Sequence, residues 1–144
     1  MILYLDTNVL VYSFEAKNEL RDLSRRWLDW HAEQPGALVV TSRLTVLEAL
    51  IGPVKESNTA RLQRTETALD QLLIIDLDDA VIRRAAEIRA RHSFRTPDAL
   101  HLATAVEAQA DIYVTADRRL KSFKGVRVVD VLRDKPGASQ RSVS

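Results

Sequence analysis

The sequence contains no cysteine, which excludes a disulfide framework, a thiolate metal site and a cysteine nucleophile. It also lacks an apolar run approaching the roughly 20 residues that a membrane-spanning helix needs, because the apolar opening stretch ends at Asp6. We therefore expect neither a signal peptide nor a transmembrane segment. A cytoplasmic location fits both absences.

Glycine and proline are scarce, at 4 residues each, and the chain is 46% hydrophobic and 28% charged. This composition is that of a globular domain and excludes collagen-like and wholly disordered chains. The formal net charge is only +1, so an argument for nucleic-acid binding must come from local charges. At 144 residues the chain has the size of one domain, which we place at residues 1–132, followed by a flexible tail at 133–144.

Five short apolar segments rich in β-branched residues are predicted strands. They are residues 2–5, 38–41, 72–77, 112–115 and 126–131. The stretches between them carry apolar residues at helical spacing. Continuous apolar strands that alternate with helices indicate a parallel sheet covered on both faces. We predict the α/β class, as a three-layer α/β/α sandwich around a central, mainly parallel five-stranded sheet.

Several helix ends are also predicted. Asp78 has the side chain of a helix cap, and Thr96 is predicted to cap another helix in which Pro97 takes the first position. Gly52 and Pro53 are predicted to end the helix that contains Glu48. The sequence shows no internal repeat and no glycine-rich phosphate loop.

Two aspartates fall at the predicted carboxyl edge of the sheet, and a third lies at the start of a predicted helix. Asp6 directly follows the first strand, Asp117 follows the fourth, and Asp98 lies in the first turn of the helix after Thr96. Ligand sites of open parallel sheets lie at this edge. Each aspartate alone also has an ordinary structural role, as a helix cap, a turn residue or a partner of the helix dipole.

Glu48 is the least ordinary of the acidic residues. It lies within an apolar stripe at helical spacing formed by Leu44, Leu47 and Ile51, so we expect it to be at least partly buried. A buried glutamate needs a positive partner, either an arginine or a metal ion. If the four acids converge, their repulsion favours a divalent cation, and all-oxygen ligation favours Mg²⁺ or Mn²⁺ over zinc.

A hard cation held in this way orients and deprotonates water and neutralises charge on a phosphate, so the implied chemistry is phosphodiester hydrolysis. His31, His92 and His101 show no spacing typical of metal ligands. We expect surface or core positions for all three.

The acidic residues stand in recognisable strings, which are LYLDTN at 3–8, Glu48 alone, TPDALH at 96–101 and TAD at 115–117. In this combination the chain, from residue 1 to about 132, resembles the PIN domain, specifically the VapC-type toxins. The resemblance implies a parallel sheet between helices, an acidic pocket that binds Mg²⁺ or Mn²⁺, and endonucleolytic cleavage of RNA by an activated water. It also implies a homodimer and a cognate antitoxin.

The resemblance also implies roles for individual residues. Asp6 and Asp98 would be metal ligands, Asp117 would complete the carboxylate set, and Glu48 would bind the metal through water or help to activate the nucleophile. The supporting polar groups would be Asn8 and Thr115. The last string departs from the usual family pattern, which often has a polar residue beside the final aspartate and an aromatic residue three positions after it, where this chain has Ala116 and Leu120.

Basic residues near the acids are candidate phosphate contacts. Arg118 opens a run of basic residues after Asp117, and Arg95 precedes Thr96. A solvated face is the alternative. Four early aromatic residues are predicted either to form an apolar groove for an antitoxin helix or to pack in the core; they are Tyr12, Phe14, Trp27 and Trp30.

The leading hypothesis is a ribonuclease toxin acting on tRNA or rRNA. A PIN-type nuclease in RNA processing or on flap DNA, and an inactive PIN-like binding module, are the alternatives. A phosphatase or response regulator would also place acids at strand ends, but the position of Glu48 argues against it. RNA loops are recognised by shape and splayed bases, so the sequence does not name the RNA.

Overall fold

The computed structural model describes residues 1–137, and residues 138–144 of the predicted tail lie outside the described part. The elements follow one another as β1 (Ile2–Leu5), α1 (Thr7–Glu15), α2 (Glu19–Ala32), β2 (Leu38–Ser42), α3 (Arg43–Lys55), α4 (Thr59–Asp70), β3 (Leu73–Ile75), α5 (Asp79–Arg91), α6 (Thr96–Glu107), β4 (Ile112–Thr115), the 3₁₀ helix η1 (Arg118–Ser122) and β5 (Val128–Asp130). All five predicted strands are present. The third and the last are shorter than predicted.

The strands form one sheet in the order β3-β2-β1-β4-β5, and every neighbouring pair is parallel. At the centre, Tyr4 of β1 is paired with Val40 of β2 on one side and Tyr113 of β4 on the other. The chain builds outward from β1 to β2 and β3, then returns to add β4 and β5 on the opposite side. The strand order therefore reverses between β1 and β4, which is where parallel sheets of this kind bind ligands.

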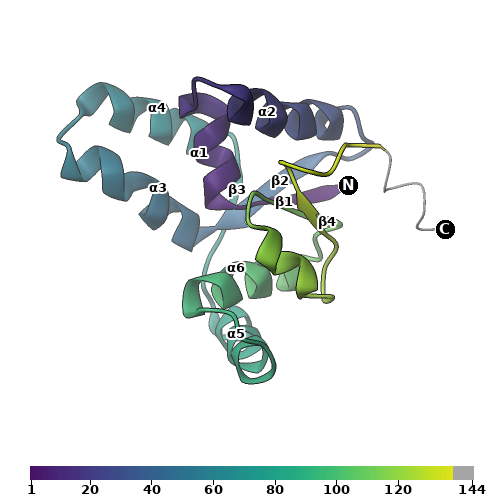
Figure 1. The fold of residues 1–144 in the computed structure, drawn as a ribbon. Coiled ribbons are helices and arrows are strands. Elements are labelled where there is room, and N and C mark those ends of the chain that lie inside the picture. The colour runs from purple at the N-terminus through teal and green to yellow at the C-terminus, as the bar shows by residue number, and fades with distance from the viewer. Residues whose placement is uncertain (138–144) are drawn as a thin grey trace.

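Side chains of successive strand residues point to opposite faces of the sheet, and each face has its own core. Leu3 and Leu5 pack with Trp27 on the side of α1 and α2, whereas Tyr4 and Tyr113 pack on the side of α5 and α6. Figure 1 shows α1 and α2 on one side of the sheet and α5 and α6 on the other. The predicted three-layer α/β/α sandwich is confirmed. No helix within residues 1–137 has the length and apolarity needed to cross a membrane.

The predicted helix starts had different outcomes. Asp78 does cap α5, since its carboxylate accepts a hydrogen bond of 3.0 Å from the Val81 amide. The predicted cap at Thr96 is wrong, because Arg95 is the residue before α6 and makes no capping hydrogen bond with its side chain. Thr96 and Pro97 both lie in the first turn, where a missing amide proton costs no helical hydrogen bond.

The predicted helix end at Gly52 and Pro53 is also wrong, because α3 continues to Lys55. Pro53 has no amide proton and so removes one helical hydrogen bond, and it lies only two residues before the last residue of α3. The ladder resumes at Glu56, whose amide donates to the Gly52 carbonyl at 3.0 Å.

The longer α3 carries an apolar face that residues 1–137 leave exposed. Leu47, Ile51 and Val54 are 59%, 55% and 62% exposed. The stripe that predicted burial of Glu48 is therefore mostly exposed itself, and the partial burial of Glu48 has another cause, described below. Apolar residues at this spacing on one helix form a continuous exposed strip, which we call the α3 stripe.

Asp134, which the sequence places in the tail, is tied to the domain. Its carboxylate accepts hydrogen bonds of 2.8 Å from the Asp130 amide and from Lys121 Nζ. Its carbonyl oxygen accepts one of 3.2 Å from the buried Trp27 indole. Burial acts to raise the pKa of Asp134, but the hydrogen bonds from the Asp130 amide and from Lys121 outweigh this effect and hold the pKa below its usual range.

Because the pKa of Asp134 is lower in the folded than in the unfolded chain, its stabilising effect is present above the unfolded pKa and is lost as the pH falls through the folded pKa. We expect Asp134→Ala to lower the free energy of unfolding by about 1 kcal/mol at pH 7. The difference from the wild type should shrink below about pH 4. Urea unfolding from pH 7 to pH 3 measures it, with the exposed Asp29→Ala as control, and a difference independent of pH would contradict the prediction.

Candidate active site

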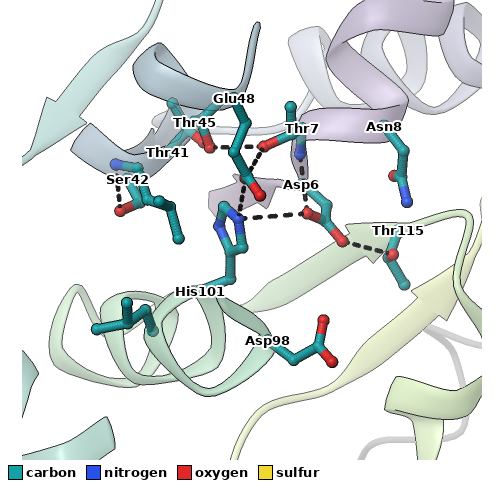
Figure 2. Close-up of polar contacts among 12 residues, drawn as sticks. Asp6, Thr7, Asn8, Thr41, Ser42, Thr45, Glu48, Asp98, His101 and Thr115 are labelled. Atoms are coloured by element: carbon teal, nitrogen blue, oxygen red, sulfur yellow. Dashed lines mark hydrogen bonds and ion pairs between the residues drawn. The ribbon is translucent and has the colours of Figure 1, made fainter. Parts of the chain in front are cut away.

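A pocket of 480 Å³ lies where β1 and β4 end. Residues from four separate segments line it, and they are Asp6, Thr7, Asn8, Val11, Tyr12, Glu48, Arg95, Pro97, Asp98, His101 and Asp117. All four predicted acids are among them. Figure 2 shows how the side chains labelled there approach one another from α1, α3, α6 and the end of β4. The structure therefore brings the four acids together in one pocket.

Asp6 is both a helix cap and a wall of the pocket. One carboxylate oxygen accepts a hydrogen bond of 2.8 Å from the Thr7 amide at the start of α1, and the other accepts one of 2.7 Å from the Thr115 hydroxyl. The residue is only 7% exposed. Burial raises the pKa of Asp6, although His101 and the hydrogen bonds from Thr115 and Thr7 act to lower it. The structural and functional interpretations of Asp6 are therefore compatible.

Asn8 and Thr115 hold the segments around Asp6 together. The Thr115 hydroxyl donates to Asp6 and accepts a hydrogen bond of 3.0 Å from the Asp117 amide. The side-chain oxygen of Asn8 accepts a hydrogen bond of 3.2 Å from the Ala116 amide. Both residues thus fasten the loop after β4 to the residues that follow β1, as supporting polar groups would.

Glu48 has His101 as its close positive partner. The Oε1 atom of Glu48 accepts hydrogen bonds from His101 Nε2 at 2.6 Å and from the Thr7 hydroxyl at 2.8 Å. Burial acts to raise the pKa of Glu48, but the hydrogen bond and charge of His101 outweigh it and hold that pKa below its usual range. The sequence argument allowed an arginine or a metal ion as the partner and missed the histidine.

His101 is only 4% exposed, and the sequence argument gave it no place in the site. Its other ring nitrogen, Nδ1, lies 2.6 Å from the hydroxyl of Tyr4. Burial acts to lower the pKa of His101, but the hydrogen bond to Glu48 and the charge of Asp6 outweigh that effect and raise it. The missed signal was the spacing: residues three apart on a helix share a face, and His101 is three residues after Asp98.

Arginines neutralise the remaining two acids. Arg95 Nε and Arg119 Nη2 lie 3.5 and 3.6 Å from Asp98 Oδ2. Arg119 Nη2 also lies 2.6 Å from Asp117 Oδ2, and this hydrogen bond holds the pKa of Asp117 below its usual range. Arg118, the predicted contact, is exposed and is not among the residues that line the pocket. Arg119 is the arginine that turns toward the acids, because it follows Asp117 by two residues and bonds to it through both its amide and its guanidinium.

The pocket fits a hard divalent cation in the chemistry of its donors. Its acids offer only carboxylate oxygens, and Asp6 is buried with its nearest positive partner, His101, at 4.0 Å. Within residues 1–137, no three acidic or histidine side chains stand close enough together to enclose an ion. The acids share the pocket, Arg95 and Arg119 place positive charge beside Asp98, and His101 is hydrogen-bonded to Glu48.

A second hollow lies beside α1 and α4. Its volume is 620 Å³, and it is lined by Phe14 together with α4 residues such as Ala60 and Ala68. The four aromatic residues do not form one groove: Trp27 is fully buried, as the alternative of core packing predicts, and Tyr12 lines the acidic pocket. Trp30 is partly buried and packs edge to face with Trp27 at 5.7 Å between ring centroids.

Comparisons with known proteins agree with this fold and site. The profile of the PIN domain matches residues 3–126. The chain is 32% identical over 139 residues to ribonuclease VapC47 of Mycobacterium tuberculosis (strain CDC 1551 / Oshkosh), a match that covers 95% of this chain and 98% of that protein. The chain therefore belongs to the PIN-domain family, and within it to the group that includes the VapC ribonucleases.

Solved structures of toxin–antitoxin complexes share the fold. A chain of a complex from Klebsiella pneumoniae matches with a TM-score of 0.70 and 25% identity, over 90% of this chain and 97% of that one. A chain of VapBC2 from Rickettsia felis, bound to a promoter DNA fragment, matches with a TM-score of 0.71 and 22% identity, over 90% of this chain and 98% of that one.

Burial of Asp6 leads to a prediction about the metal-free protein. Because the folded pKa of Asp6 is raised, its ionised form destabilises the metal-free fold at pH 7. We expect Asp6→Asn to unfold at a higher temperature than the wild type without metal. We also expect it to lose the stabilisation that a divalent cation bound in the pocket would give the wild type, about 2.7 kcal/mol at about 100 times Kd.

Thermal unfolding with and without Mg²⁺ measures both effects. The control is Asp79→Asn, which makes the same change of charge at a carboxylate that is 78% exposed on α5. This control should respond to Mg²⁺ as the wild type does. An undiminished Mg²⁺ response in Asp6→Asn would contradict the prediction.

Proposed function

We propose that this protein is a metal-dependent endoribonuclease that hydrolyses RNA phosphodiester bonds and serves as the toxin of a VapBC-type toxin–antitoxin pair. The observation that carries the proposal is that four carboxylates from separate segments, Asp6, Glu48, Asp98 and Asp117, line one pocket at the carboxyl ends of the central strands. Membership of the PIN-domain family and the likeness to ribonuclease VapC47 support it. Its place of action is then the cytoplasm.

The cofactor is proposed to be Mg²⁺, with Mn²⁺ as a substitute. Asp6 and Asp98 would hold the ion, and Asp117 would complete the carboxylate set once Arg119 releases it. When bound, such an ion lowers the pKa of a coordinated water and neutralises charge that develops on the phosphate. The carboxylates of the pocket are otherwise unsuited to a polyanion, so they need this charge to accept RNA.

Glu48 would orient the attacking water and accept its proton. Its pKa is held below the usual range, so the carboxylate is ionised at neutral pH. It is also 33% exposed at the pocket, which leaves room for a water beside it. Asn8 and Thr115 would keep the loops that carry Asp6 and Asp117 in register.

Arg95 and Arg119 would bind the phosphates beside the scissile bond. Their side chains are 72% and 58% exposed and already reach the acids of the pocket, so each can exchange a carboxylate for a phosphate. Arg118, exposed next to Arg119, would contact the backbone farther along the strand. The RNA is proposed to be a tRNA or an rRNA, whose splayed loop bases offer single-stranded sites.

Cleavage of labelled tRNA and rRNA by purified protein, free of antitoxin, tests the proposal. We expect discrete fragments with Mg²⁺ or Mn²⁺, none with excess chelator, and a loss of about 100-fold or more in rate for Asp98→Asn. Asp79→Asn, an exposed change of the same kind, should cleave as the wild type does. Cleavage without growth arrest on expression would favour an RNA-processing nuclease, and folded protein that cleaves nothing with any metal would favour a binding module.

The partners are proposed to be a second copy of the chain and a cognate antitoxin. The α3 stripe offers a second copy an apolar contact, and the hollow beside Phe14 offers an antitoxin helix a place to dock. These are separate surfaces on α3 and on α1 with α4. Toxin–antitoxin complexes among the solved relatives support the antitoxin.

The proposed dimer is tested by analytical ultracentrifugation. We expect the molar mass measured for the wild type to be twice the chain mass of 16.2 kDa. The double variant Leu47→Asp with Ile51→Asp should sediment as a monomer, because two charges would be buried in the contact without partners. Leu132→Asp, at another exposed apolar position, should remain dimeric. A wild type that is monomeric at every concentration would contradict the prediction.

A further inference from the structure

We propose that His101 is a positioning residue that fixes the carboxylate of Glu48 for the reaction, with the buried hydroxyl of Tyr4 as its anchor. The proposal rests on the proposed nuclease function and adds to it a residue outside the four acids. In Figure 2 the imidazole of His101 points from α6 toward Glu48, which descends from α3. The side chain therefore links the helix that carries Asp98 to the helix that carries Glu48.

The imidazole is held on its inner side. His101 Nδ1 lies 2.6 Å from the hydroxyl of Tyr4, and Tyr4 is 0% exposed. The Tyr4 ring is itself stacked on Tyr113, with 4.8 Å between ring centroids and an interplanar angle of 10°. Tyr4 and Tyr113 belong to paired central strands of the sheet. The imidazole is thus anchored to the buried centre of the sheet.

The same ring reaches the site on its outer side. His101 Nε2 lies 2.6 Å from Glu48 Oε1. Ionised Glu48 can only accept, so Nε2 carries the proton and donates it. A Tyr4 hydroxyl that donates to Nδ1 matches the neutral ring with its proton on Nε2, whereas a hydroxyl that accepts from Nδ1 leaves Nε2 a donor only when the ring is doubly protonated. Tyr4 as the donor therefore supports the tautomer that donates to Glu48.

The contact leaves Glu48 with one oriented oxygen. Oε1 accepts from both His101 and the Thr7 hydroxyl, and among residues 1–137 no side chain or amide hydrogen-bonds Oε2. A glutamate that is 33% exposed on a helix surface would otherwise sample several rotamers, and fixing one of them has an entropic cost. The hydrogen bonds from His101 and Thr7 offset this entropic cost before any ligand binds. The second oxygen is then held ready for the ion or its water.

Three variants separate anchoring from positioning. His101→Leu keeps much of the bulk of the ring but removes both hydrogen bonds. His101→Gln retains an amide donor near the former Nε2 and should rescue part of the function. Tyr4→Phe keeps the aromatic stack and removes only the anchor. We expect the defect to be largest for His101→Leu and smaller for the other two.

The readouts are Mn²⁺ affinity, measured by electron paramagnetic resonance on purified full-length protein without RNA, and the kcat and KM of RNA cleavage. The loss of Mn²⁺ affinity and of kcat in Glu48→Gln is the reference with which the other variants are compared. We expect His101→Leu to reproduce most of it, as a loss of about 10- to 100-fold in Mn²⁺ affinity or in kcat, with the KM for RNA unchanged. In a Glu48→Gln background the same change should add little, since His101 acts through Glu48.

The outcomes distinguish this proposal from the one it rests on. A wild type that neither binds Mn²⁺ nor cleaves RNA would overturn the nuclease function itself. A normal wild type with a His101→Leu variant of equal affinity and kcat would overturn only the positioning role, as would a defect that persists undiminished in the Glu48→Gln background. If thermal unfolding shows that His101→Leu does not fold, Tyr4→Phe and His101→Gln decide, and wild-type values in both would overturn the proposal.

Discussion

The pairing of β1 with β4 is the constraint on which the rest of this structure depends. It joins the first strand to one that begins more than 100 residues later, and it brings Asp6 within 2.7 Å of the Thr115 hydroxyl, across 109 positions of sequence. Because the strand order reverses between these strands, helices on both faces leave a crevice at their carboxyl ends. Asp6 and Asp117 reach the pocket only because this pair forms.

The acids of the pocket also stabilise the ends of helices, which offsets the repulsion between their negative charges. Asp6 caps α1 and Asp117 caps η1, so each carboxylate satisfies amides that would otherwise lack partners. Asp98 lies in the first turn of α6, where the helix dipole favours it. The guanidinium of Arg119 offsets the charges of Asp98 and Asp117, and His101 donates a hydrogen bond to Glu48. The same carboxylates thus stabilise the fold and line the site, and Asp6 is where the two roles conflict, because burial disfavours its ionised form.

Short sequence patterns predicted the features that depend on neighbouring residues. The strands, the cap at Asp78 and the four acids follow from short patterns, and the structure has them. The end of α3 was mispredicted because Pro53 interrupts a helix only weakly near its last turn. The spacing of three residues from Asp98 could have placed His101 near the site, but it could not name its partners, because Tyr4 and Glu48 are 97 and 53 positions away. Pairings at that distance are set by the sheet, which no pattern around residue 101 contains.

Helix α3 has one side that faces the pocket and another that is exposed at the surface. Thr45 and Glu48 lie on its inner side, where Thr45 hydrogen-bonds Thr7 and Thr41 and Glu48 faces His101. Leu47 and Ile51 lie on the exposed side. Successive helix positions are separated by about 100°, so the two faces belong to one rigid element. The apolar surface that the proposed second copy would bury and the carboxylate of Glu48 therefore lie on opposite sides of the same helix.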